Sequence, residues 1–524
     1  MSLSRRTFVT GSALAAGMLA VPGRSSAAPV TRINRRVVII GSGFGGSVAA
    51  LRLTRAGVPV TLLEQGRAWP TGPNANTFPT LRTLDERVLF YDSAPVLFNQ
   101  PFLGPVAYAG LLRAVVAPTM TVVSGCGYGG GSLTYQGMTL EPARNVFEQE
   151  FPSAIDYDEM HAEHYPVVRQ MLGAQVAPDA LLNSRNYHAS AVFKARAEKL
   201  GYPVSKIPMP IDWTFALREL AGEMKPSYTN GDCALGVNNG GKNSLDVTYL
   251  RQAEQTGNLE VRLLHRVTDI SRTAAGQWQV VVARTDVHAR LQETVVITTP
   301  TLVMGAGTMG TSNLLVRAAA HGAIPDLPDG LGTNWGSNAD RIYAWSPLTE
   351  QLGTPQGGPV VYGNLDWGEA ATANTVIQAS IPPVLLGGPG FPLNATIMVG
   401  YGVSKARGQF VYNPLLDKAV LKWEHEADRV IQAKIGPKVK AIAGPSVLVD
   451  TNLALPWTWH PMGGASMGLV CDYEGRVQGQ RGLYVLDGAL LPGSSAACNP
   501  SMSIAAVAER AMKRILTHDV GTII

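Results

Sequence analysis

One histidine of this chain lies in the stretch WTWHPMGGASMG, residues 457–468, between a tryptophan and a run of glycines. Histidine is rare here, with 9 among 524 residues, and the glycines around His460 are typical of tight turns rather than of a regular element. A neutral imidazole can take up a proton near neutral pH, as the base of an enzyme does. The alternative is a core histidine that happens to lie beside a loop. The elements around it must decide between these two interpretations.

A nucleotide-binding unit is predicted near the N-terminus. It consists of an apolar strand, three glycines spaced as GxGxxG, a helix, and a second strand that ends in an acid: residues 36–40, Gly41, Gly43, Gly46, residues 47–56, residues 60–63 and Glu64. The glycines allow a sharp turn, a close approach of pyrophosphate to the backbone, and close packing of the helix on the strand. The helix N-terminus then faces the phosphates, and Glu64 accepts hydrogen bonds from the ribose hydroxyls. This order predicts a dinucleotide-binding site.

A second GxGxxG occurs at residues 305–310, directly after the apolar run 301–304. It could form a separate NAD site, but no strand ending in an acid follows it. We therefore interpret it as another strand and helix of the same cofactor domain. Between the two motifs, residues 261–299 alternate between apolar and polar side chains, which predicts a small antiparallel meander laid on that sheet.

Two further segments point to the same ligand. The run GCGYGGGS at residues 125–132 is so rich in glycine that the backbone is expected to approach a ligand there. Near the C-terminus a strand ends in Asp-Gly and a helix opens with Asn-Pro-Ser: residues 483–486, Asp487, Gly488 and residues 499–501. Proline is pre-organised for the first helical position. The positive end of this helix would face a developing negative charge, such as that of a reduced flavin ring.

The composition and the cysteines limit the classes of protein to which this chain can belong. Apolar residues make up 46% of the chain and charged residues 16%, and the net charge is only +4, so we find no signature of nucleic-acid binding. His161 and His164 could face a metal from one helix, but no third ligand is evident, and a solvated helix face explains them better. We therefore predict no metal site. The four cysteines form no CxxC pair and no zinc spacing, so a disulfide is allowed outside the cell but not implied: Cys126, Cys233, Cys471 and Cys498.

The first 27 residues are predicted to be a twin-arginine export signal. Arg5 and Arg6 are followed by a short apolar stretch, residues 11–22, and by small residues up to Ala27, where we expect cleavage. The apolar stretch is too short to span a bilayer, which needs about 20 residues. The alternative is a disordered tail with a chance arginine pair. We expect export in the folded state, with the cofactor already bound, to the periplasm, the cell surface or the medium.

In this order the motifs resemble the glucose–methanol–choline (GMC) flavoprotein oxidoreductases, and among them the bacterial cholesterol (sterol) oxidases with non-covalent FAD. The likeness runs from about residue 36 to 516 and is carried by these segments: GSGFGG, GGGSLTYQGMTLEP, KNSLDVTYL, GAGTMGTSNLLVRA, HPMGGASMG and CNPSMSIAAVAER. It implies an α/β fold, in which a discontinuous Rossmann-like FAD-binding domain is joined to an α+β substrate-binding domain with an antiparallel sheet. The implied FAD-binding domain comprises residues 35–70, 239–325 and 450–517, and the substrate-binding domain comprises residues 71–238 and 326–449.

The resemblance also assigns roles to individual residues. His460 would be the base that takes the hydroxyl proton of an alcohol. Asn499 would hold the alcohol or alkoxide oxygen through its amide; alternatively, it simply caps the helix begun by Pro500. FAD would be contacted by the glycine segments, the acid and the residues near the flavin ring: Gly41, Gly43, Phe44, Gly45, Gly46, Glu64, Gly131, Met138, Val267, Asp487, Gly488 and Ser501.

The chain departs from these relatives at two places. Residues 135–136 are Tyr-Gln where the relatives have Asn-Gly beside the flavin. Sterol oxidases carry a glutamate in a strand, three residues before a proline; here this position falls on Ala379, or on Ser380 if the next proline is the reference. Because residues of a strand alternate between its faces, Gln378 is expected to point away from the substrate. No carboxylate is therefore expected to move a proton within the oxidised product.

We expect an FAD-dependent oxidoreductase that transfers a hydride to flavin N5 from the CH–OH group of a hydrophobic, sterol-like alcohol, without the coupled isomerisation. The electrons would pass to oxygen or to a quinone. Two other classes stay open: a non-redox lyase of the same fold that keeps FAD as a scaffold, and a flavin-containing binding protein without turnover. The expected partners are the alcohol and the electron acceptor, with at most transient contact with a membrane surface and no nucleic acid. We expect a monomer.

Overall fold

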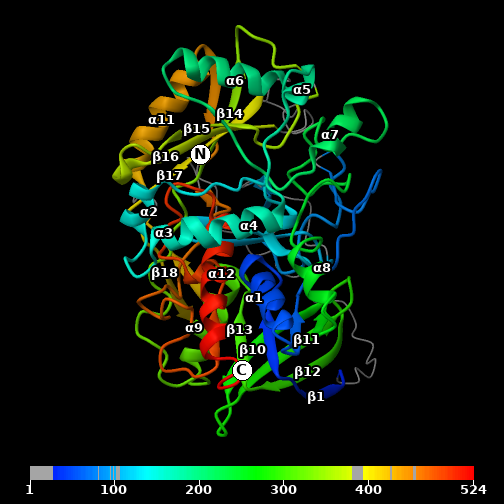
Figure 1. Cartoon of the computed structure of the whole chain (residues 1–524), viewed down its shortest axis with the longest axis vertical. Coiled ribbons are helices and arrows are strands. Elements are labelled where there is room, and N and C mark those ends of the chain that lie inside the picture. Colours follow the sequence, from blue (N-terminus) through cyan, green and yellow to red (C-terminus); the bar gives the residue numbers. More distant parts are fainter. Residues whose placement is uncertain are drawn as a thin grey trace, which may run out of the picture.

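The computed structural model describes residues 28–524, except residues 81, 95, 98–99, 102–106, 354, 381–393, 425, 427 and 453–455. The predicted export signal, residues 1–27, lies outside the described residues. The described chain has a lower part built on a parallel sheet and an upper part built on an antiparallel sheet (Figure 1). Within these ranges, no helix is long and apolar enough to cross a bilayer. All four cysteines are buried free thiols.

The lower part is built on a five-stranded sheet in which every pair of strands is parallel. In spatial order the strands are β22 (Leu483–Val485), β13 (Thr301–Met304), β2 (Val37–Ile40), β3 (Val60–Leu63) and β9 (Leu259–Arg262). All residues of β2, β3 and β13 are buried, as expected for parallel strands covered on both faces. Helix α1 (Phe44–Arg55) packs on this sheet and helix α12 (Pro500–His518) packs on α1. The α/β fold with a Rossmann-like sheet is therefore confirmed.

A second sheet of four strands lies at the bottom of the molecule (Figure 1). Its spatial order is β1 (Val30–Asn34), β12 (Leu291–Thr299), β11 (Trp278–Thr285) and β10 (His265–Arg272). Strand β11 is antiparallel to both β10 and β12, and β1 is parallel to β12. The predicted meander is confirmed for these three strands, but its predicted start at Val261 is wrong. Val261 belongs to β9, an edge strand of the parallel sheet whose residues are only half-buried. The sequence of β9 therefore alternates between apolar and polar residues, as that of an antiparallel strand does.

The upper part is built on a six-stranded antiparallel sheet. In spatial order its strands are β20 (Ser446–Asp450), β14 (Arg341–Pro347), β17 (Thr396–Gly402), β16 (Asn374–Ala379), β15 (Tyr362–Asp366) and β8 (Ser205–Lys206). Helices α6 (His188–Lys199) and α11 (Arg429–Ala443) bury Phe193 and Ile435 in one cluster with Val376 and Met398 of the sheet. The other face buries Ile377, Ala379 and Tyr401 in a separate cluster. The predicted antiparallel sheet is therefore present.

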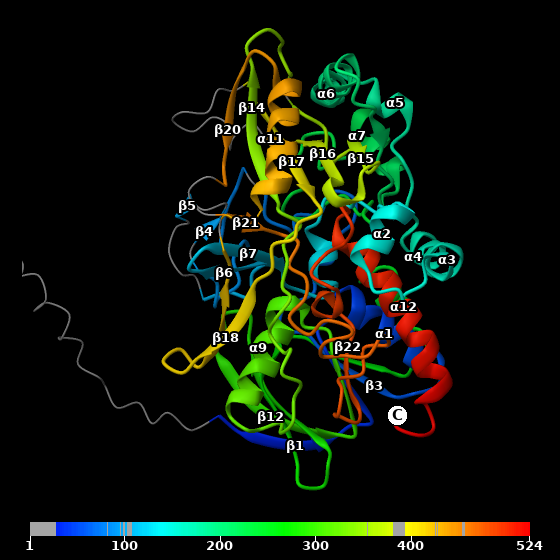
Figure 2. The same cartoon turned by 90° about the vertical axis from the view of Figure 1, so that its left-hand side faces the viewer.

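A small three-stranded sheet lies between the two parts (Figure 2). It consists of β6 (Leu112–Ala117), β7 (Met120–Gly125) and β21 (Trp457–Thr458), with β21 parallel to β7. Strand β7 leads into the glycine run at residues 125–132, and β21 leads directly into His460. We call residues 457–468, which contain His460, the histidine loop. The small sheet thus places the glycine run and the histidine loop at two neighbouring parallel strands.

The remaining elements cover these sheets. Helices α2 (Arg144–Glu150) and α4 (Tyr165–Leu172) bury Phe147 and Tyr165 in the same core as the parallel sheet, and α3 (Tyr157–Glu159) lies between them in the chain. The others are α5 (Asp179–Leu182), α7 (Trp213–Leu220), α8 (Tyr249–Glu254), α9 (Gly307–Ala320), β4 (Val96–Leu97), β5 (Gln100–Pro101), β18 (Gln409–Asn413) and β19 (Lys418–Lys422). The division into an FAD-binding and a substrate-binding domain, with its boundaries, stays a prediction.

Candidate active site

The two GxGxxG motifs meet backbone to backbone at the carboxyl ends of β2 and β13. Gly41 has a φ of +93°, and a Cβ placed on it would lie 2.3 Å from the carbonyl oxygen of Gly305. The glycine run approaches from the other side, because a Cβ on Gly130 would lie 2.8 Å from the Cα of Gly43. The second GxGxxG therefore packs against the first instead of lining a site of its own.

Glu64 lies at the end of β3, and only 5% of it is exposed. Its carboxylate accepts hydrogen bonds from the Ser42 hydroxyl at 2.6 Å and from the Gly66 N–H at 2.9 Å. Burial raises the pKa of this carboxyl above its ordinary value, and the hydrogen bonds oppose that rise. The Ser42 hydroxyl also accepts the N–H of Gly129 at 3.0 Å, so one serine joins the acid to the glycine run. The ribose contact of Glu64 stays a prediction.

Gly43 and Gly131 are glycines that the protein's own packing does not require. Gly43 has a φ of −71°, which any residue can adopt, and a Cβ on it would meet only the Gly305 oxygen at 3.9 Å. A Cβ on Gly131 would meet no described atom within 4 Å. Bare backbone with open space beside it is what a dinucleotide needs. The buried Tyr135 hydroxyl and Asn499 Oδ1 have no hydrogen-bond partner among the described residues, so these residues fit FAD.

Phe44 and Val267, two more predicted FAD contacts, lie beside these loops. Phe44 opens α1, and its ring packs edge-on against that of Tyr135, with the centroids 5.5 Å apart. Val267 lies on β10, two residues after His265, whose backbone N–H donates to the Glu64 carbonyl at 2.9 Å. Both residues are therefore close to the elements that would hold the cofactor.

The histidine loop is fixed to the end of β22 and the start of α9. The N–H of Gly463 donates to the carbonyl of Gly488 at 2.9 Å. The Thr308 hydroxyl donates to the carbonyl of Pro461 at 2.8 Å. Two residues of the HPMGG segment that follow His460 are thus bound to the end of β22 and to α9.

Asp487 is a buried acid with internal partners. Its carboxylate accepts hydrogen bonds from the Thr311 hydroxyl at 2.5 Å and from the Ala489 N–H at 2.9 Å. Burial raises the pKa of Asp487 to about 6. A Cβ on Gly45 would lie 1.8 Å from the carbonyl oxygen of Leu486, so α1 touches the same strand end. The side chain of Asp487 holds β22 and α9 together.

The side chain of His460 is held in one orientation by a hydrogen bond and does not merely fill space in the core. Its Nδ1 lies 2.7 Å from Oδ1 of Asp340, and its backbone N–H donates to the Thr458 hydroxyl oxygen at 2.9 Å. The exposed fraction is 19% for the histidine side chain and 8% for that of Asp340. An ionised carboxylate only accepts hydrogen bonds, so Nδ1 carries the proton and Nε2 keeps a free lone pair. This arrangement has the geometry of a base.

Asn499 is the N-cap residue of α12, but its side chain makes no capping hydrogen bond. The capping alternative is therefore wrong. Its Nδ2 donates to the Met138 carbonyl and to the Ser501 hydroxyl oxygen, both at 2.5 Å. Both amide hydrogens are used, so the free atom of this amide is the acceptor Oδ1. The prediction that this amide holds the alcohol or alkoxide oxygen stays a prediction; in this conformation the atom without a partner among the described residues is the acceptor Oδ1.

Tyr401 links the two predicted catalytic residues. Its ring packs edge-on against the imidazole of His460, with the centroids 5.2 Å apart. Its hydroxyl donates to the Met138 sulfur at 3.5 Å, and the carbonyl of Met138 binds Asn499. Burial raises the pKa of Tyr401 well above its ordinary value, so this phenol stays neutral. The structure thus connects His460 through Tyr401 and Met138 to Asn499 and Ser501.

The strand β16 presents alternate residues to this cluster and away from it. Ala379 is buried in one cluster with Met138, Tyr401 and Cys498. Gln378 points to the opposite face, where it accepts a hydrogen bond from Ser190 of α6 at 2.7 Å. The direction expected for Gln378 is therefore observed. The residue on the face of the candidate site is an alanine.

Sequence reasoning missed Asp340 and Tyr401. Asp340 is 120 residues before His460 and belongs to no motif. Tyr401 lies in β17 with nothing in its neighbours to mark it. For both residues, only the approach of distant strands in the folded chain reveals the contact.

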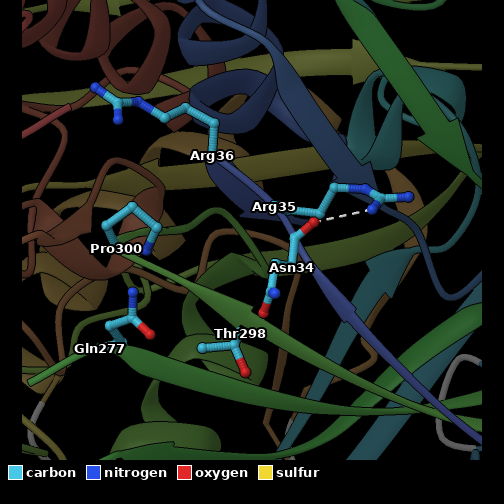
Figure 3. A pocket seen from close by; sticks show the side chains of 6 residues that line it. All are labelled: Asn34, Arg35, Arg36, Gln277, Thr298 and Pro300. Atoms are coloured by element: carbon cyan, nitrogen blue, oxygen red, sulfur yellow. Dashed lines mark hydrogen bonds between the residues drawn. The ribbon is translucent and has the colours of Figure 1, made fainter. Parts of the chain in front are cut away.

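A surface pocket of about 490 Å³ lies elsewhere, lined by Asn34, Arg35, Arg36, Gln277, Thr298 and Pro300 (Figure 3). Arg36 and Pro300 directly precede β2 and β13, so the pocket lies at the amino ends of the parallel strands. Ligands of such sheets bind at the carboxyl ends. The guanidinium of Arg35 is also paired already with Glu260 at 2.7 Å. We do not assign this pocket to the active site.

Comparison with known proteins agrees with this geometry. Two family models described as GMC oxidoreductase match residues 106–335 and 426–508, and a model described as NAD(P)-binding Rossmann-like domain matches residues 39–100. A cholesterol oxidase of Mycobacterium tuberculosis (strain H37Rv) is 27% identical, covering 91% of this chain and 90% of that protein. A cholesterol oxidase of Acinetobacter baumannii is 26% identical, covering 91% and 94%.

A solved structure supports the fold. The crystal structure of pyridoxine 4-oxidase from Mesorbium loti superposes with a TM-score of 0.63 at 16% identity, covering 93% of this chain and 100% of that one. At this identity the likeness concerns the fold alone. The two GMC models together span more than half of the chain, and the similar cholesterol oxidases align along nearly all of it. The chain therefore belongs to the GMC oxidoreductase family, as an FAD-dependent alcohol oxidoreductase.

Proposed function

We propose that the protein oxidises the CH–OH group of a hydrophobic, sterol-like alcohol, with His460 as the base. The observation that carries the proposal is the hydrogen bond of 2.7 Å between His460 Nδ1 and Asp340, because it leaves Nε2 free to accept a proton. FAD, when bound, supplies the hydride acceptor. The sequence similarity to two cholesterol oxidases supports the choice of a sterol-like alcohol.

In this proposal the protein's own side chains handle the hydroxyl group. Nε2 of His460 takes the hydroxyl proton, while Nδ1–H stays on Asp340, so that the positive charge of the imidazolium forms beside a carboxylate. Such acid–base help typically amounts to ~100- to 10,000-fold in rate. The role of Asn499 toward the hydroxyl oxygen stays a prediction, because both hydrogens of its amide are used by Met138 and Ser501 and its unpartnered atom among the described residues is the acceptor Oδ1.

The surroundings favour an apolar alcohol. Met138, Ile377, Ala379, Tyr401 and Cys498 belong to one buried cluster. An apolar body placed against these side chains loses contact with water, which stabilises the complex by about 25 cal/mol per Å² of buried apolar surface. Sites for hydrophobic small molecules are typically formed by apolar side chains with a few polar groups among them.

The proposed reaction stops at the ketone. Ala379 faces the cluster and carries no acid, and the neighbouring Gln378 is bound to Ser190 and Thr396 on the opposite face. An amide cannot act as the base of a double-bond shift in any case. Oxidation without isomerisation is therefore part of the proposal.

The test is an anaerobic screen in which the FAD-loaded protein is mixed with single alcohols and the yellow colour is followed. The panel contains a 3-hydroxy-5-ene sterol, a long-chain secondary alcohol, benzyl alcohol and pyridoxine. Bleaching by the sterol, and weak or no bleaching by the small alcohols, is expected. Reoxidation with air or with a quinone then identifies the acceptor. If no alcohol bleaches the flavin, the protein is a lyase or a binding protein instead.

We also propose export through the twin-arginine signal at residues 1–27. The pair Arg5-Arg6 and the short apolar stretch after it support this location. Replacing both arginines by lysine should keep the FAD-loaded protein inside the cell, as measured by fractionation. Unchanged export of that variant would contradict the proposal.

A further inference from the structure

We propose that Asp340 is the positioning residue that fixes which nitrogen of His460 carries the proton. The inference rests on the proposed function of His460 as a base, because only that role needs a bare Nε2. It goes further in naming a second residue on which the base depends, and in stating how that residue acts.

The carboxylate of Asp340 is surrounded by donors. Oδ1 receives His460 Nδ1 at 2.7 Å, and Oδ2 receives the Thr458 hydroxyl at 2.6 Å and the backbone N–H of Trp459 at 3.2 Å. A carboxylate bound by donors on both oxygens has no proton of its own to offer. The imidazole must therefore donate through Nδ1. The three donors come from three consecutive residues of the histidine loop, so Asp340 fixes the loop and the ring at once.

Asp340 is held in place by an unusual turn. We call residues 337–340 the positioning turn. Its two central residues, Asn338 and Ala339, both have a φ of +55°, a left-handed conformation that residues other than glycine adopt at a cost in energy. Consecutive strained residues persist only where the surrounding structure enforces them, and they cluster at functional sites.

The positioning turn also contacts the segment before Asn499. The amide nitrogen of Asn338, a residue only 3% exposed, donates to the Ser495 hydroxyl oxygen at 2.8 Å and to the Cys498 carbonyl at 2.7 Å. One turn therefore binds the histidine through Asp340 and the approach to Asn499 through Asn338. This explains how two residues from different loops keep a fixed relation to each other.

An asparagine could not replace Asp340. In Asp340→Asn one carboxylate oxygen becomes an NH₂ group. The backbone N–H of Trp459 is a fixed donor toward Oδ2, so the amide oxygen belongs there and the NH₂ group faces His460. The imidazole would then accept at Nδ1 and carry its proton on Nε2, the tautomer that cannot act as a base toward substrate.

The direct test is nitrogen NMR of the FAD-loaded protein labelled with ¹⁵N-histidine, with the signals of residue 460 identified by their loss in His460→Gln. In the wild type above neutral pH, Nδ1 is expected to be protonated and Nε2 unprotonated. The two should exchange roles in Asp340→Asn. The matched control is Asp450→Asn, which removes a largely buried carboxylate paired with Arg341 at 2.5 Å and should leave the tautomer unchanged. A proton on Nε2 in the wild type would overturn the proposal even if Asp340→Asn failed to fold.

A second measurement separates this inference from the proposed function. With the alcohol that bleaches the wild type fastest, the maximal rate of anaerobic flavin reduction should fall at least ~100-fold in Asp340→Asn. The alcohol concentration for half-maximal rate should stay the same, and Asp450→Asn should stay within about 2-fold. If no alcohol bleaches the wild type, the proposed function fails and the tautomer alone decides the role of Asp340. An unchanged tautomer in Asp340→Asn overturns the role of Asp340 whatever the rates.

Discussion

Tyr401 packs its ring edge-on against the imidazole of His460, with 5.2 Å between the centroids. The two residues come from different sheets, since Tyr401 lies on β17 of the antiparallel sheet and His460 follows β21 of the small sheet. The face of the imidazole is thus fixed by the upper part of the molecule, while its Nδ1 is fixed by Asp340. The imidazole is therefore held by two contacts that come from different parts of the fold.

We predict that the ring of Tyr401 matters and its hydroxyl does not. Tyr401→Phe keeps the contact with His460 and loses the bonds of the hydroxyl to the Met138 sulfur and to Thr375, neither of which involves the base, so its rate of flavin reduction should stay within about 2-fold of wild type. Tyr401→Leu removes the ring, and a base misplaced by about 1 Å can cost ~100-fold. Stopped-flow reduction of both variants checks this. Equal loss in the two variants would assign the effect to the hydroxyl.

FAD is predicted to be bound without a covalent link. Covalent relatives attach the flavin through a histidine near the glycine run, and residues 125–138 contain none. Acid or heat precipitation should leave the yellow colour in the supernatant and a colourless pellet, as read by absorbance of both fractions. Colour that stays with the pellet after washing in denaturant would contradict this prediction.

Because an alanine, Ala379, occupies the face of β16 toward the candidate site, we predict which product is released. Given a 3-hydroxy-5-ene sterol, the enzyme should release the unconjugated ketone, and Ala379→Glu should add the shift to the conjugated enone because it places a carboxylate on that face. Gln378→Glu puts the same group on the opposite face, beside Ser190, and is the matched control. Product ultraviolet absorbance, corrected for spontaneous isomerisation, distinguishes them. Enzyme-paced formation of the enone by the wild type would show that another residue supplies the base.

Asp487 should make the stability of the protein depend on pH. Its native pKa of about 6 lies above the value of about 3.9 for an unfolded aspartate, so the native state binds the proton more tightly. This carboxyl therefore stabilises the fold below about pH 4, and the contribution, at most about 3 kcal/mol, is lost as the pH rises through 6. Urea unfolding gives the free energy of unfolding at pH 4 and at pH 7. The difference between these two free energies should become smaller in Asp487→Asn, but not in Asp326→Asn, which changes an exposed position. An unchanged difference in Asp487→Asn would refute the assignment.

Features fixed by local backbone geometry could be predicted from the sequence. The turn at Gly41 and the unit that ends at Glu64 need particular residue types at particular spacings, so they are visible in the chain itself. The meander was misplaced at Val261 because a half-buried edge strand alternates like an antiparallel one. The direction of Gln378 followed from strand alternation alone.

The partners of the predicted site residues could not be predicted in the same way. The contact between Asp340 and His460 joins positions 120 residues apart, and a carboxylate in a turn has many solvated alternatives. Asn499 stands at a position where asparagine commonly caps a helix, yet its amide turns to Met138, 361 residues away. Such choices depend on which groups the folded chain places nearby, and no local pattern records them.

The central claim is that His460 is the base that takes the hydroxyl proton. The most direct measurement is stopped-flow reduction of the bound flavin under anaerobic conditions by the alcohol that bleaches the wild type fastest. His460→Gln is compared with His288→Gln, which changes an exposed histidine in the turn between β11 and β12. We expect His460→Gln to bind FAD normally and to be reduced at least ~100-fold more slowly, while His288→Gln matches the wild type. Reduction of His460→Gln at the wild-type rate would show that His460 is not the base and only packs beside its loop.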